Sequence, residues 1–288
     1  MKTPSKTKSL IIVALIYAIA TAGAFVVYYF TRFLGTLWAV FIADAAATVL
    51  VWAAGIVLRN PSVYDPYWSV TPMIIIPLWM ALGGDRVTLK EALLLGAVAV
   101  WGVRLTYNWV SGWCGLTHID WRYEMLKEKN PKMWFVTNFF GINMMPTVFV
   151  YLAMIPAYFL IQSESGVSPF MLVGFAVCIT SAALQLISDT QMKHHRELRT
   201  GVPIDTGLWR YSRHPNYFGE VMFWWGIFIM TLGLPAAPLL RIVGAVFMTG
   251  LFVFISIPMM ERHIEQKSPE YSEYKSRVSM LIPWKRKE

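Results

Sequence analysis

Polar residues crowd the stretch GLWRYSRHPNYFGEVMFWWG, residues 207–226, before and within an apolar run. Pro215 fits the first turn of a helix, so Glu220 falls about one turn inside that helix, at membrane depth. An ionisable residue there is costly and usually functional. The two arginines and the histidine before Pro215 gather positive charge beside the free N–H groups of a helix start, which suits a phosphate or carboxylate. An interfacial anchor is the structural alternative, but an anchor needs no buried acid.

A second polar stretch, SDTQMKHHR at residues 188–196, follows another apolar run directly. On a continued helix, Asp189, Lys193 and Arg196 fall on or near one face. The same residues suit a solvated helix end, because basic side chains are favourable near a helix C-terminus. The adjacent histidines point in different directions on a helix and match no metal-ligand spacing, so no metal is expected.

Two further stretches place polar groups near span boundaries. Arg104, in WGVRLTYNW, lies inside an apolar run. It either pairs with a cofactor phosphate or a buried acid such as Glu220, or extends its head to the cytoplasmic face. Asp65, in NPSVYDPYWS, precedes a proline and is therefore expected in an extended or turn conformation. The tail from Glu261 to Trp284 has the pattern of an interfacial helix on an anionic membrane leaflet.

Composition indicates the elements that must position these groups. The 288 residues are 56% hydrophobic and 15% charged, with a mean hydropathy of +0.49, which is too apolar for a soluble domain of this length. The net charge of +8 is expected to reflect basic cytoplasmic loops rather than nucleic-acid binding. At roughly 20 apolar residues a span, the sequence predicts eight transmembrane helices, with seven to nine possible. They are expected at about 9–30, 35–58, 69–83, 89–110, 138–161, 169–187, 217–233 and 236–260.

The basic residues predict an orientation. With the N-terminus inside, 20 Lys and Arg residues fall in cytoplasmic segments and 4 outside, while Arg104 lies within a span, which accounts for all 25. Both termini are therefore expected in the cytoplasm. We expect one membrane domain over residues 1–288, with an N-terminal two-span segment at 1–60 and a core at 61–288 that carries cytoplasmic cofactor-binding loops and the tail.

Taken together, the motifs DPYWS, WGVRL, SDTQMKHHR, GLWRYSRHPNYFGE and EYKSRVSMLIP resemble the steroid 5-alpha-reductase superfamily, most closely its bacterial multi-spanning branch. The resemblance covers about residues 60–284. The loop RHPNY-x-G alone is less specific, because the isoprenylcysteine carboxyl methyltransferases and the sterol C14 reductases share a similar loop.

The resemblance implies NADPH as the cofactor. Asn216 and Glu220 match the cofactor-contacting Asn and Glu of these reductases, and Asp189 and Arg196 match another conserved pair of that pattern. The reductases' early Gln-Glu pair is replaced, since Asp65 stands near the acid without the Gln. Candidate catalytic proton donors are Asp65, Tyr67 and Tyr107. The expected cofactor-binding residues are Arg104, Asp189, Arg196, Arg210, Tyr211, Arg213, His214, Asn216, Tyr217, Glu220, Tyr274 and Arg277.

The sequence thus predicts an NADPH-dependent reductase in the bacterial inner membrane, with the cofactor site facing the cytoplasm. Its substrate would be a steroid-like or isoprenoid molecule from the bilayer, with a carbon–carbon double bond conjugated to a carbonyl. Membrane lipid is the other expected partner; nucleic acid or an obligate protein partner is not. One alternative is a methyltransferase that uses S-adenosylmethionine on a lipophilic acceptor, although five Lys and Arg residues in 188–216 favour a cofactor phosphate. Another is a lipid-binding or transport protein without enzymatic activity.

Overall fold

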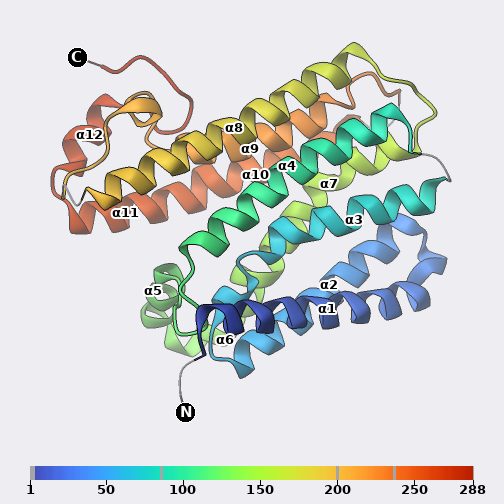
Figure 1. The fold of residues 1–288 in the computed structure, drawn as a ribbon, viewed down its shortest axis with the longest axis horizontal. Coiled ribbons are helices and arrows are strands. Elements are labelled where there is room, and N and C mark those ends of the chain that lie inside the picture. The colour runs from blue at the N-terminus through green and yellow to red at the C-terminus, as the bar shows by residue number, and fades with distance from the viewer. Residues whose placement is uncertain (1–3, 85–86, 199–200, 236–237, 288) are drawn as a thin grey trace. The chain divides into compact units, whose positions relative to one another are not determined.

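Every regular element of the chain is helical in the part that the structure, a computed structural model, describes: residues 4–84, 87–198, 201–235 and 238–287 (Figure 1). The predicted fold class, an all-α polytopic membrane bundle, is confirmed, and each of the eight apolar segments contains helix. The turn expected at residues 234–238 includes residues 236 and 237, which lie outside the described residues. The main helices are α1 (Lys6–Thr31), α2 (Thr36–Val57), α3 (Tyr67–Gly83), α4 (Leu89–Gly112), α5 (Trp121–Lys129), α6 (Trp134–Val136), α7 (Met145–Gln162), α8 (Pro169–Glu197), α9 (Pro215–Ile229), α10 (Pro238–Gly250), α11 (Ile257–Lys267) and α12 (Tyr271–Arg277).

Among the described residues, six helical segments rather than eight are long and apolar enough to cross a membrane. Helices α3 and α9 are shorter, with 17 and 15 residues. At about 1.5 Å per residue they rise only about 26 and 23 Å, less than the roughly 30 Å of a hydrocarbon core. The six long helices fit an integral membrane protein, and the side on which the termini lie stays a prediction.

Local sequence signals explain where the long helices begin and where they change register. The hydroxyl of Ser168 accepts a hydrogen bond from the backbone N–H of Met171 at 3.2 Å and Pro169 follows, so α8 begins there. Two stretches are π-helical, Thr137–Met144 before α7 and Leu251–Ser256 between α10 and α11. A π-helical turn holds more residues than an α-helical turn, so it shifts the face that the following helix presents.

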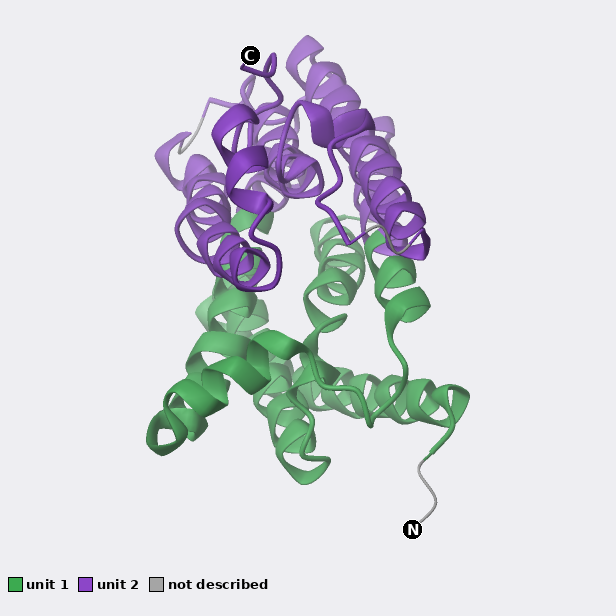
Figure 2. Ribbon diagram, turned by 90° about the vertical axis from the view of Figure 1, so that its left-hand side faces the viewer, with its two compact units in different colours: residues 1–86, 105–154 green, residues 87–104, 155–288 purple. Residues whose placement is uncertain are grey.

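The chain divides into two compact units, shown in different colours in Figure 2. Unit 1 comprises residues 1–86 and 105–154, and unit 2 comprises residues 87–104 and 155–288. Unit 1 has a core in which Val13 of α1 and Val51 of α2 pack with Tyr64 and Trp113. The domain boundaries expected from sequence stay a prediction.

In unit 2, α8 and α9 lie side by side at very close range (Figure 1). A Cβ atom added to Gly226 would lie 2.6 Å from the Sγ of Cys178, and one added to Gly174 would lie 2.5 Å from the backbone nitrogen of Met230. Neither position has room for a larger residue, and small residues of this kind let membrane helices approach closely. The polar positions near the C-terminal end of α8 therefore meet those in the first turns of α9.

Candidate functional site

Five polar residues of unit 2 meet between α4, α8 and α9, and we call them the Arg104 cluster: Arg104, Gln185, Asp189, Asn216 and Glu220. Arg104 Nη1 donates a hydrogen bond to Asp189 Oδ2 at 3.0 Å. Its Nη2 donates to Gln185 Oε1 and lies 3.9 Å from Glu220 Oε2. Asn216 Nδ2 donates to Asp189 Oδ1 at 3.3 Å. Four of the predicted cofactor residues are thus brought together, and Arg104 does pair with buried acids.

Aromatic side chains surround Glu220, whose residue is 4% exposed. The indole nitrogen of Trp101 donates to both carboxylate oxygens at 3.1 and 3.0 Å, and that of Trp224 donates to Oε1 at 3.1 Å. The Trp101 ring also stacks on Phe223, with 4.8 Å between centroids. A carboxylate removed from water is costly unless it is hydrogen-bonded or paired, and these contacts together with Arg104 provide both.

Two donors of the Arg104 cluster are unsatisfied. Arg104 Nε and Gln185 Nε2 are buried with no hydrogen-bond partner among the described residues, and Gln185 is 1% exposed. Buried donors without acceptors are rare and cost roughly 1–3 kcal/mol each, so we expect a water molecule or a ligand to complete this pair. The cluster combines these donors with the carboxylates of Asp189 and Glu220. This mixture suits a group that carries both a carboxylate and a cation.

A second polar group, the Glu261 cluster, comprises Arg213, His214, Glu261, Tyr271 and Lys275. Glu261 Oε1 accepts hydrogen bonds from Arg213 Nε at 2.7 Å, the Tyr271 hydroxyl at 3.4 Å and the His214 ring at 3.2 Å, where the role depends on the tautomer. Its Oε2 lies 3.1 Å from Lys275 Nζ. Burial lowers the pKa of His214 below its ordinary value, although Glu261 opposes the shift. This carboxylate is fully engaged by its own chain.

The Glu261 cluster holds the C-terminal tail in place. Arg213 Nη1 donates to the carbonyl oxygens of Lys275 and Val278, both at 2.7 Å. The Tyr274 hydroxyl donates to the carbonyl oxygen of Trp209 at 2.6 Å. Three N–H groups of the Arg213 guanidinium are therefore bonded inside the molecule. These groups are not available to the phosphate of a cofactor.

The other predicted cofactor residues lie at the surface or against the Glu261 cluster. Arg196, Arg210 and Tyr211 are exposed. Arg277 forms an ion pair with Glu273 of its own helix at 2.6 Å. The Tyr217 ring stacks on the His214 imidazole of the Glu261 cluster, with 5.3 Å between centroids. Their assignment to a cofactor stays a prediction.

The three predicted proton donors belong to unit 1, and none is hydrogen-bonded to another within the described residues. Asp65 accepts a hydrogen bond from the Tyr123 hydroxyl, and burial raises the pKa of Asp65 to about 7. The Tyr67 hydroxyl donates to Asp44 Oδ1 at 2.9 Å. Tyr107 is 68% exposed. Their catalytic role stays a prediction.

Sequence reasoning missed three residues around the Arg104 cluster. Gln185 and Trp224 each lie four residues from a predicted acid on the same helix, a spacing that brings side chains together. That spacing was the available signal for both. Trp101 lies one turn before Arg104, and nothing in the sequence indicates that its indole reaches Glu220.

Comparison with known proteins favours methyl transfer. An uncharacterized protein of Schizosaccharomyces pombe is 22% identical over 262 residues, which cover 81% of this chain and 76% of that protein. Methanethiol S-methyltransferase 1 of Bradyrhizobium diazoefficiens is 39% identical over 82 residues, 27% of this chain and 25% of the relative. Protein-S-isoprenylcysteine O-methyltransferase of Saccharomyces cerevisiae is 38% identical over 84 residues, 29% of this chain and 33% of the relative. No solved structure matches the chain.

These relatives overturn two predictions. The NADPH-dependent reductase is wrong, and so is NADPH as cofactor, because the similar proteins with a named activity are methyltransferases. The error came from the RHPNY-x-G loop, which both classes share, and from counting basic residues as phosphate ligands. Arg213 of that loop binds Glu261 and the tail instead. The methyltransferase alternative is the better reading.

The family comparison covers most of the chain. A family described as "Protein of unknown function (DUF1295)" matches residues 51–278, which include the Arg104 and Glu261 clusters but not α1. The matched segment is well over half of the 288 residues. The chain therefore belongs to the DUF1295 family.

Proposed function

We propose that this protein is an S-adenosylmethionine-dependent methyltransferase and that the Arg104 cluster forms part of its cofactor site. The observation that carries the proposal is the similarity to two proteins named as methyltransferases. The proposal also includes a distant relationship between this chain and the steroid 5-alpha-reductase superfamily. That relationship covers the shared RHPNY-x-G loop and does not extend to the reductase chemistry.

The residues present fit this cofactor better than a dinucleotide. S-adenosylmethionine supplies an electrophilic methyl group on a cationic sulfonium and carries an amino-acid group with one amine and one carboxylate. Asp189 and Glu220 offer negative charge, and Trp101 lies beside Glu220 with a π-system that attracts cations. Arg104 Nε and Gln185 Nε2 are donors that still need an acceptor. The roles of these residues are to bind and orient the amino-acid group and to exclude water from it.

The acceptor in this proposal is a lipophilic small molecule that enters from the bilayer. The relatives are named for methanethiol and for protein-S-isoprenylcysteine, and both names denote acceptors in which sulfur carries an apolar group. Because six helical segments are long enough to cross a membrane, an apolar acceptor would reach the protein from the bilayer rather than from water. We extend the proposal to the bacterial inner membrane, with the cofactor site facing the cytoplasm as the basic loops predict.

A binding titration tests the cofactor. We expect S-adenosylmethionine to raise the unfolding temperature of the purified protein and NADPH to leave it unchanged. Saturation at 100 times the dissociation constant stabilises the folded state by about 2.7 kcal/mol, a shift that is easily measured. Glu220→Gln is expected to weaken the effect, whereas Glu128→Gln, on the exposed surface of α5, is the matched control.

A transfer assay tests the reaction. Protein in native membranes is incubated with S-adenosylmethionine labelled in its methyl group, and the organic extract is counted. Label in the extract that depends on Glu220 supports the proposal. Failure of wild-type protein to bind S-adenosylmethionine at millimolar concentration, while it remains folded, would refute it.

A further inference from the structure

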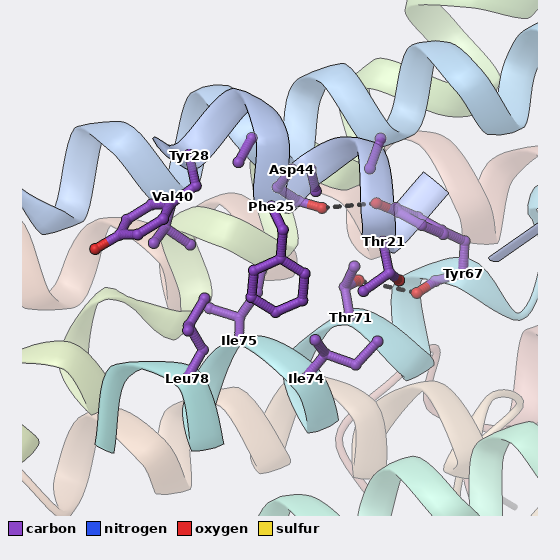
Figure 3. A pocket seen from close by; sticks show the side chains of 13 residues that line it. Thr21, Phe25, Tyr28, Val40, Asp44, Tyr67, Thr71, Ile74, Ile75 and Leu78 are labelled. Carbon is purple, nitrogen blue, oxygen red and sulfur yellow. Dashed lines mark hydrogen bonds between the residues drawn. The ribbon is translucent and has the colours of Figure 1, made fainter. Parts of the chain in front are cut away.

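Unit 1 contains a pocket between α1, α2 and α3 that the proposed function does not use (Figure 3). Its lining side chains surround a half-open space of about 440 Å³, part of which is continuous with the surroundings of the protein. Most of its wall is apolar, with Phe25, Ile75 and Leu78 among the lining residues. Asp44 and Tyr67 form a polar end, so the pocket has the two-part character of a site for an amphiphile.

The polar end contains an acid with no partner charge. Asp44 lies in the interior of α2, a membrane-length helix, and is 5% exposed. The Tyr67 hydroxyl donates to its Oδ1 at 2.9 Å. Within the described residues, no lysine, arginine or histidine forms an ion pair with Asp44. A buried carboxylate in a membrane span is costly unless it is paired or protonated, so a cationic occupant of the pocket would stabilise the charged form of Asp44.

One wall of the pocket is accessible to lipid. Phe25 lies on α1 and is 50% exposed, although it also lines the pocket. Ile74 and Thr71 of α3 line the opposite side in Figure 3. A molecule dissolved in the bilayer can therefore reach the pocket beside Phe25, whereas Asp44 is buried within it.

We propose that this pocket binds a single-chain alkyl amine, with the ammonium group paired to Asp44 and the alkyl chain packed between Phe25, Ile75 and Leu78. The amine would supply the countercharge that Asp44 lacks among the described residues, and the apolar wall would accept one alkyl chain. This site is separate from the Arg104 cluster and does not depend on whether that cluster binds S-adenosylmethionine.

Binding is measured with radiolabelled dodecylamine on full-length protein in nanodiscs of neutral lipid, with empty nanodiscs subtracted. Unlabelled dodecylamine, dodecanol and dodecanoate compete in parallel on wild-type protein. This series needs no amino-acid substitution. Because the three ligands have the same chain length, it isolates the effect of the head-group charge. We expect dodecylamine to compete most tightly, dodecanol at least about tenfold more weakly, and dodecanoate least, because hydrogen bonds to charged groups are the stronger ones.

Three variants locate the bound amine. Asp44→Asn keeps the shape of the side chain and is expected to weaken dodecylamine binding about tenfold or more. Ile75→Trp is expected to fill the pocket and abolish binding. Tyr67→Phe should weaken binding, whereas its matched control Tyr64→Phe should not. Tyr64 is as buried as Tyr67, but its hydroxyl shares a hydrogen bond of 2.7 Å with the Thr147 hydroxyl, outside the pocket.

Equal competition by dodecanoate and dodecylamine would overturn the proposal, as would unchanged binding to Asp44→Asn. Tight binding of dodecanol alone would make the occupant a neutral alcohol and would also overturn it. Each variant is first checked for a single peak in size exclusion and for its unfolding temperature, so that loss of binding is not confused with loss of fold. Binding of S-adenosylmethionine, measured in parallel, reports on the proposed function independently.

Discussion

The Arg104 and Glu261 clusters both set arginine against buried carboxylate in unit 2, yet their hydrogen bonding differs. Glu261 accepts from three side chains on one oxygen and faces Lys275 on the other, while Arg213 also holds the tail. In the Arg104 cluster, two buried donors have no acceptor among the described residues. The difference teaches that arginine near a helix start does not identify a ligand site. Buried donors without acceptors beside hydrogen-bonded carboxylates, as in the Arg104 cluster, indicate a ligand site better than arginine does.

The largest expected effect comes from breaking the saturated cluster. Glu261→Ala leaves Arg213 buried without its carboxylate, which typically costs about 3–5 kcal/mol of folding free energy. Thermal unfolding of purified protein measures the loss. Glu265→Ala is the matched control, because Glu265 also pairs with Lys275, at 2.8 Å, but nearer the surface, where such pairs contribute about 0–1 kcal/mol. Equal losses in the two variants would contradict a structural role for the cluster.

The Arg104 cluster should respond in binding rather than in stability. Glu220→Gln keeps the shape of the side chain but removes the negative charge to which we assign a role in binding the proposed cofactor. We expect the affinity for S-adenosylmethionine to fall about 10- to 100-fold, the equivalent of roughly 1.4–2.7 kcal/mol. Isothermal titration gives the affinity and thermal unfolding gives the stability. A variant that binds normally but unfolds early would assign Glu220 to structure.

Helix packing supports the Arg104 cluster specifically. Gly226→Ala puts a Cβ atom 2.6 Å from Cys178 Sγ and 3.0 Å from the carbonyl oxygen of Gly174, so α8 and α9 must separate. Overpacking of this kind costs about 1–3 kcal/mol and should weaken cofactor binding as well. At Gly96 of α4, no atom lies within 4 Å of an added Cβ, so Gly96→Ala should leave the stability unchanged or slightly raised. Similar unfolding temperatures for both variants would show that the contact is not tight.

The smallest effect concerns pH. Burial lowers the pKa of His214 below its ordinary 6.5, so the folded state binds a proton less readily than the unfolded chain. The stability that this group contributes is therefore present above pH of about 6.5 and falls as the pH drops below it, by at most about 1.4 kcal/mol per pH unit for one proton. His214→Gln should flatten this part of the pH–stability curve. An unaltered slope would mean that another group titrates there.

Sequence periodicity and hydropathy were enough to predict the helical class and the place of every apolar segment. The number of spans stays a prediction, because α3 and α9 are apolar but shorter than the six membrane-length segments, and hydropathy alone does not report where a helix ends. Depth in the membrane left Arg104 with a phosphate, a buried acid or the cytoplasmic face as alternatives, and in the structure it pairs with Asp189 and Glu220. That Glu220 meets Trp101 depends on packing between helices more than 100 residues apart, which no local pattern encodes.

The cofactor prediction failed for a different physical reason. Counting arginines treats every guanidinium as available to a ligand, and availability is decided by what the folded chain offers instead. Arg213 meets Glu261 and two carbonyl oxygens, and those partners lie 48 to 65 residues away along the chain. Only the folded structure distinguishes that arginine from Arg104.

The π-helical stretch Leu251–Ser256 has a consequence for how this protein tolerates insertions and deletions. A π-helical turn holds more residues than an α-helical turn, so a one-residue deletion within this stretch can be absorbed by a return to α-helical geometry. Residues in an α-helix are spaced by about 100° around the axis, so a one-residue deletion in α11 between this stretch and Glu261 would turn Glu261 away from Arg213 although every side chain of the cluster was retained. We therefore expect single-residue gaps among functional homologues to fall within Leu251–Ser256 and to be rare between that stretch and Glu261.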